Sequence, residues 1–122
     1  MNKEILKQRT KVLAIRIIKM IENMPETRIS NVIGSQLLRS ATSISANYRA
    51  SCRAKSTRDF INKLKIVEEE ADETILWLEL IEETKIFKSE KLLPLKIEAN
   101  EILSIIVASI KTAKKIAQPP QP

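Results

Sequence analysis

The chain has 122 residues, 43% of them hydrophobic, and its 21 basic and 15 acidic side chains leave a formal net charge of +6. This length and composition exclude a disordered chain and predict one compact domain with a buried core. Histidine is absent, and cysteine and glycine each occur once, which excludes disulfide frameworks, histidine metal sites and glycine-rich phosphate loops. We therefore expect neither a cofactor nor a bound metal.

Residues 1–11 alternate charged and aliphatic side chains and do not resemble a secretion signal. No stretch of the sequence approaches the ~18 consecutive apolar residues that a membrane-spanning helix needs. We therefore expect a cytoplasmic protein that does not insert into a membrane.

Apolar residues recur at helical spacing in four segments, the first of which extends from about Lys3 to Asn23. Pro25 ends this segment, because proline cannot continue the hydrogen-bond ladder of a helix. The second segment extends from about Ser30 to Arg53, and small side chains surround its apolar face: Gly34, Ser35, Ser40, Ser43, Ser45 and Ala46. We expect these small side chains to let a neighbouring helix approach closely.

The third helix has the clearest sequence signal. Ser56 followed by Asp59 resembles the capping box that begins many helices, and it predicts a start near Thr57. The helix is expected to reach about Lys85, with apolar residues repeating by threes and fours along one seam. This seam consists of Phe60, Leu64, Val67, Ala71, Thr74, Leu78 and Ile81.

The fourth segment ends near Ile116, and its start stays open because Pro94 suits the first turn of a helix and not its interior. Its apolar seam is predicted to run from Leu92 to Ala117. The proline-rich residues 118–122 are predicted to form a disordered tail. Residues 1–117 thus predict a single all-α domain, an antiparallel up-down-up-down four-helix bundle.

A second set of apolar side chains in the third segment lies away from the seam: Ile66, Leu76, Trp77 and Leu80. Phe60 and Leu80 project about 160° apart at about 100° per residue, which is wider than one buried face of a helix. We predict that the second set forms the interface of a homo-oligomer. A single wide core stripe is the alternative.

Charge is divided unequally along the chain. Residues 1–65 hold 14 basic and 4 acidic residues, a balance of +10, whereas residues 66–122 hold 7 and 11, a balance of −4. Basic residues on the face of the second segment away from its seam, together with two at the following turn, are predicted to bind nucleic acid through its phosphates: Arg39, Arg49, Arg53, Lys55 and Arg58.

The acids of the third segment offer the basic cluster a different partner. Glu68, Asp72, Glu79 and Glu83 form one stripe that could pair with basic side chains of another helix or another subunit. Whether Arg49 and Arg53 contact phosphate or pair with such acids stays open at this point. Serines are frequent in the second segment, but the chain has no histidine to activate them or to serve an RNA-cleaving site, so we expect no enzyme activity.

The run Ser-Ala-Asn-Tyr-Arg-Ala-Ser-Cys-Arg-Ala-Lys-Ser at residues 45–56 resembles the signature of four-helix-bundle proteins encoded in 23S ribosomal RNA intervening sequences. Residues 63–73 and 107–115 are similar to this family in order and spacing. The Asn-Tyr-Arg element resembles one branch of the family. The resemblance implies a bundle that assembles as a ring-like homopentamer, in a family without an established catalytic reaction.

These observations favour a non-enzymatic homo-oligomeric scaffold that binds structured RNA or another nucleic acid through a basic surface. The alternative is a protein–protein adaptor in which the charges serve subunit pairing and solubility.

Overall fold

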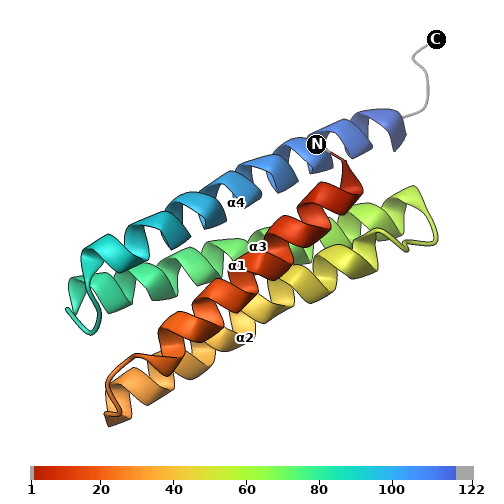
Figure 1. Ribbon diagram of the computed structural model, residues 1–122. Helices are drawn as coiled ribbons and strands as arrows, with labels where there is room; N and C mark the ends of the chain where they lie inside the picture. The colour runs from red at the N-terminus through yellow and green to blue at the C-terminus, as the bar shows by residue number, and fades with distance from the viewer. Residues whose placement is uncertain (1, 118–122) are drawn as a thin grey trace.

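Four helices follow one another in the computed structural model, which describes residues 2–117: α1 (Lys3–Glu22), α2 (Arg28–Ser51), α3 (Thr57–Glu83) and α4 (Ser89–Ala117). They run alternately up and down, so the end of the bundle where α1 begins also holds the ends of α2 and α4 (Figure 1). This arrangement confirms the predicted all-α fold and its four-helix-bundle architecture. Met1 and the predicted tail at residues 118–122 lie outside the described residues.

Side-chain caps set the starts of the first three helices. Asn2, Thr27 and Ser56 each accept a hydrogen bond from the backbone N–H three residues later, at 2.9, 3.1 and 3.0 Å. The start of α3 after Ser56 confirms the prediction, and the Asp59 carboxylate accepts a further hydrogen bond from the N–H of Lys55, the residue before the cap, at 3.1 Å. Because the Thr27 hydroxyl caps it, α2 begins two residues before the predicted Ser30.

The start of α4 lies at Ser89, so Pro94 stands in its second turn. Proline has no N–H to donate to the carbonyl four residues earlier, that of Glu90, and the helix continues through the exposed Pro94 without this one hydrogen bond. At the other end of the helix, the last residue of the predicted apolar seam, Ala117, is exposed and does not belong to the core.

One apolar core extends through all four helices and contains nearly all of the predicted seams. Among the helix pairs in contact, packing is most extensive between α2 and α3 and least extensive between α1 and α4. The hydroxyl of Thr74 on α3 donates to the buried Ser40 on α2 at 2.9 Å, which confirms the expected close approach there. The expectation is wrong for Ser35 and Ala46, because both are exposed.

The turn between α3 and α4 contains a lysine in a conformation that favours glycine. Lys85 has a φ of 59°. Its N–H bonds to the carbonyl of Glu82, and the N–H of Ile86 bonds to that of Ile81, both at 3.0 Å. This is the Schellman pattern that ends many helices, and its left-handed position usually carries glycine because a Cβ is strained there. The turn therefore retains a long basic side chain at a cost in stability.

Over residues 2–117, none of the helices has an apolar stretch long enough to cross a lipid bilayer.

Candidate nucleic-acid interface and subunit surfaces

The structure separates Arg39 from the rest of the predicted nucleic-acid cluster. Its guanidinium, on α2, forms ion pairs with two carboxylates of α3, with Glu70 at 3.1 Å and with Glu73. These contacts raise the pKa of Arg39, and its hydrogen bond holds the pKa of the Glu73 carboxyl below the ordinary value. Arg39 thus links two helices within one protomer, and a phosphate contact would have to compete with both carboxylates.

The other four predicted residues lie at the end of α2, in the following turn and at the start of α3: Arg49, Arg53, Lys55 and Arg58. All four side chains are exposed, and none forms an ion pair with another described residue. Within the protomer, therefore, neither Arg49 nor Arg53 pairs with an acid of α3, which was one of the two alternatives for these residues. Their contact with phosphate stays a prediction.

Antiparallel packing adds further basic side chains to these four. Lys3 of α1 lines the same cavity of about 410 Å³ as Lys55. Phe60 of α3 lines both this cavity and a second one, whose other lining residues belong to the last turns of α4. We call this part of the molecule the basic end and define it by eight exposed residues, Lys3, Arg49, Arg53, Lys55, Arg58, Lys111, Lys114 and Lys115.

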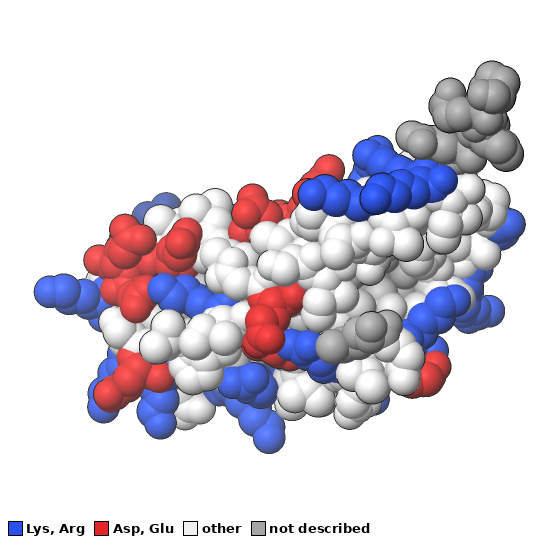
Figure 2. All heavy atoms as spheres, turned by 90° about the horizontal axis from the view of Figure 1, so that it is seen from above, with Lys and Arg blue, Asp and Glu red and all other residues white. Residues whose placement is uncertain are grey.

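Figure 2 shows lysine and arginine side chains gathered toward the end of the molecule where α4 finishes, and a mixture of both charges toward the opposite end. None of the eight residues of the basic end forms an ion pair with another described residue. The nearby acids Glu4 and Asp59 are paired instead with Lys7 and Lys63, at 3.3 and 2.6 Å. The basic end therefore keeps a net positive charge.

The predicted interface residues of α3 fall into two pairs. Ile66 and Leu76 are exposed, at 42% and 46% of their surface. Trp77 and Leu80 are half-buried; Trp77 packs against the core, and its indole N–H donates to Glu73 at 3.2 Å. For Trp77 the wide-stripe alternative is thus partly correct, whereas Ile66 and Leu76 stay exposed among residues 2–117.

Sequence reasoning missed apolar residues that the other helices expose. Four lie on α1, three on α2 and three on α4, in that order Ile5, Val12, Ile15 and Ile18; Ile29, Val32 and Leu38; Leu93, Ile97 and Ile116. It also missed the main polar link between α1 and α4, a two-pronged ion pair in which Arg9 donates to the two carboxylate oxygens of Glu98 at 2.6 and 2.9 Å. The excess of isoleucine in α1 beyond its seam was the available signal.

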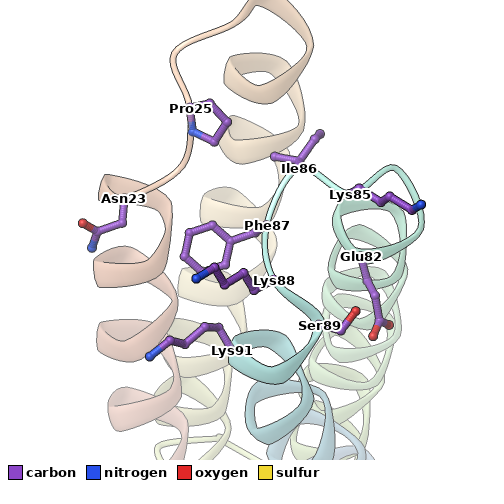
Figure 3. A pocket seen from close by; sticks show the side chains of 9 residues that line it. All are labelled: Asn23, Pro25, Glu82, Lys85, Ile86, Phe87, Lys88, Ser89 and Lys91. Atoms are coloured by element: carbon purple, nitrogen blue, oxygen red, sulfur yellow. The ribbon is translucent and has the colours of Figure 1, made fainter.

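A cavity of about 710 Å³ lies at the end of the bundle opposite the basic end, where the α1–α2 and α3–α4 turns meet. Sequence reasoning also missed this site, although three lysines and an aromatic residue follow one another closely in residues 85–91. Its lining consists of Asn23, Pro25, Glu82, Lys85, Ile86, Phe87, Lys88, Ser89 and Lys91 (Figure 3).

The geometry defines a small antiparallel helical bundle with one strongly basic end. Residues 2–108 match the family model described as 23S rRNA-intervening sequence protein, and the chain belongs to this family, which confirms the resemblance. It is also similar to a crystal structure of a protein of unknown function from the S23 ribosomal protein family of Bacteroides thetaiotaomicron VPI-5482. That match has a TM-score of 0.84 and 35% sequence identity, and it covers 91% of this chain and 99% of the other. A search of curated proteins returned no match.

Proposed function

We propose that the protein is a non-enzymatic, homo-oligomeric scaffold that binds structured RNA through its basic end. The observation that carries this proposal is the gathering of eight exposed lysines and arginines from four helices and the α2–α3 turn, with the nearby acids Glu4 and Asp59 already paired. Lysine and arginine bind phosphate oxygens, and each neutralised phosphate releases counterions from the nucleic acid.

The oligomeric part of the proposal rests on α3. Ile66 and Leu76 are exposed on this helix, and the acidic stripe of Glu68, Asp72, Glu79 and Glu83 forms no ion pair with other described residues. A second copy could cover the apolar pair and place basic side chains against the stripe. A homopentamer, as the resemblance implies, would present five basic ends, so weak contacts to one RNA would add as avidity.

Charge reversal at the basic end tests the RNA proposal. A variant carrying Arg53→Glu, Lys55→Glu and Arg58→Glu should lose about two orders of magnitude or more in affinity for a labelled RNA hairpin at low salt. A matched control carries Lys11→Glu, Lys19→Glu and Arg28→Glu, three exposed residues outside the basic end that form no ion pair with described residues. It has the same net charge and should bind almost as the unmodified protein does.

Equal losses in the two variants would contradict a local site, because only total charge would then matter. An unmodified protein that fails to bind the hairpin at low salt would contradict RNA binding altogether and favour the adaptor alternative.

Sedimentation velocity tests the assembly. Ile66→Glu with Leu76→Glu should dissociate the oligomer while circular dichroism shows unchanged helicity, because both side chains are exposed in the protomer. The control pair is Val12→Glu with Ile15→Glu on α1, which are exposed to a similar extent, at 39% and 42%. An unmodified protein that sediments as a 13.9 kDa monomer at high concentration would contradict the assembly.

A further inference from the structure

The cavity between the α1–α2 and α3–α4 turns combines an aromatic wall with several cationic side chains. Phe87 is half-buried and packs against the core, so its position is fixed while part of the ring faces the cavity. In Figure 3 the ring lies between Pro25 and the amino end of Lys88, and Lys91 extends toward α1. The cavity thus has a flat apolar surface with amino groups beside it.

The charges of this cavity are available to a ligand. Lys85, Lys88 and Lys91 are exposed, and none forms an ion pair with another described residue. The acid in the lining, Glu82, is already paired with Lys96 at 2.5 Å, and this contact holds the pKa of its carboxyl below the ordinary value. The lining therefore carries a net positive charge, which favours an anionic ligand.

The size of the cavity and the backbone around it fit a small ligand. Its volume of about 710 Å³ falls within the range of about 300–1,000 Å³ that is usual for small-molecule sites. Lys85 forms part of its wall in a left-handed conformation that glycine would adopt without strain. Strain of this kind is concentrated at functional sites, and here it lies in the backbone of the cavity wall, since the amino end of Lys85 points away from Phe87 (Figure 3).

We propose that this cavity binds a nucleoside phosphate, with the base stacked on Phe87 and the phosphate held by Lys88 and Lys91. The phosphate lies toward the first turn of α4, where the helix dipole adds to the attraction. The ligand is either a free mononucleotide or an unpaired nucleotide of an RNA chain. In the second form the inference rests on the proposed function, and the site reads single-stranded RNA while the basic end holds its backbone.

Calorimetric titration of the full chain with adenosine 5′-monophosphate tests the site. Lys88→Gln with Lys91→Gln should weaken binding at least about tenfold, because both phosphate contacts are charge-assisted. Phe87→Leu keeps an aliphatic side chain against the core and should weaken binding about five- to hundredfold through the loss of stacking. The control Lys11→Gln with Lys65→Gln removes two exposed charges elsewhere and should leave binding unchanged.

Two ligand fragments separate the parts of the site. Adenosine and inorganic phosphate should each bind at least about tenfold more weakly than the monophosphate. If adenosine binds as tightly as the monophosphate, the lysines have no role and the proposal is wrong. If inorganic phosphate binds as tightly, or if Phe87→Leu has no effect, the aromatic wall has no role and the proposal is equally wrong.

A labelled hairpin with a single-stranded loop distinguishes the two sources of the nucleotide and separates this inference from the proposed function. Weaker hairpin binding by the Lys88→Gln, Lys91→Gln variant supports an RNA nucleotide, whereas unchanged hairpin binding with weaker monophosphate binding supports a free nucleotide. If this variant changes neither titration, the cavity proposal is wrong, although the basic-end variant can still lose RNA binding. If the basic-end variant binds the hairpin as the unmodified protein does, while the Lys88→Gln, Lys91→Gln variant binds its ligand more weakly, the proposed function is wrong and the cavity proposal is supported.

Discussion

At the basic end, positive side chains come from four helices and the α2–α3 turn, whereas at the cavity end Lys88 and Lys91 lie beside a hollow that contains an aromatic ring (Figure 3). The two ends also differ in whether their residues suit the local backbone conformation. At the basic end Ser56 caps α3 by accepting from the N–H of Asp59, and the Asp59 carboxylate accepts from the N–H of Lys55. The cavity end holds a left-handed lysine, Lys85, and a glycine inside a helix, Gly34. The first arrangement suits a repeating phosphate backbone, and the second suits one small ligand.

Loss of a buried leucine at either end should have the largest effect on stability. Leu64→Ala near the basic end and Leu78→Ala near the cavity end should each lower the free energy of unfolding by about 2–5 kcal/mol. Both side chains are fully buried in one core. Urea denaturation followed by circular dichroism measures the loss. A biphasic transition in one variant would contradict a core that is continuous between the two ends.

Removal of the strained side chain at the cavity end should stabilise the protein. Lys85→Gly should raise the free energy of unfolding by about 1 kcal/mol, because glycine adopts a φ of 59° without a steric penalty. Lys85→Ala is the matched control, since it removes the charge but keeps the Cβ. Equal urea midpoints for the glycine and alanine variants would show that backbone strain at this position has no cost.

Gly34→Ala should also stabilise the protein, by about 0.5–1 kcal/mol, since alanine has the higher helix propensity. A Cβ at this position would meet Ile21 Cγ2 at 3.6 Å and Met24 Cε at 3.8 Å, which are ordinary van der Waals contacts with flexible side chains. Thermal unfolding measures the change. A lower melting temperature would indicate that α1 and α2 approach more closely here than the structure describes.

The change in the free energy of unfolding with pH should be similar at the two ends of the bundle. It should be smaller than the changes expected from the substitutions above. Hydrogen bonds from Lys63 and Lys96 hold the pKa values of Asp59 and Glu82 below their ordinary values, and Arg39 does the same for Glu73. A carboxyl group whose pKa is lower in the folded protein stabilises the fold at any pH above its pKa in the unfolded chain, which is about 4. This contribution is lost as the pH falls through the pKa of the folded protein. The unfolding midpoint should therefore decrease between about pH 5 and pH 3.

Glu73→Gln should make this decrease shallower, because glutamine does not titrate. A midpoint that stays constant or rises over this pH interval in the unmodified protein would contradict the assigned ion pairs.

The fold could be predicted from the sequence because its signals are local. Apolar spacing located the seams, and the capping pattern at Ser56 located the start of α3. Pro94 left the start of α4 open, because the sequence alone does not show that the helix continues through this proline in its second turn without one hydrogen bond.

The site was predicted less completely, because charge placement depends on topology. Ser40 contacts Thr74, so in antiparallel helices of equal rise Arg49 lies level with about residue 65 and Arg53 with about residue 61. The acidic run of α3 begins only at Glu68, which explains why Arg39 and not these two arginines pairs with it. The lysines of α4 were overlooked for a related reason. The second half of the sequence is acidic in sum, and only antiparallel packing places these lysines beside the α2–α3 turn.

Cross-linking of bound RNA tests the central claim most directly. A hairpin labelled with 4-thiouridine at several positions should, after irradiation, attach to peptides that span residues 49–58 and 111–115 at the basic end, and mass spectrometry identifies these peptides. Cross-links found only on the middle turns of α1 and α3, with none at either group of basic residues, would contradict the account.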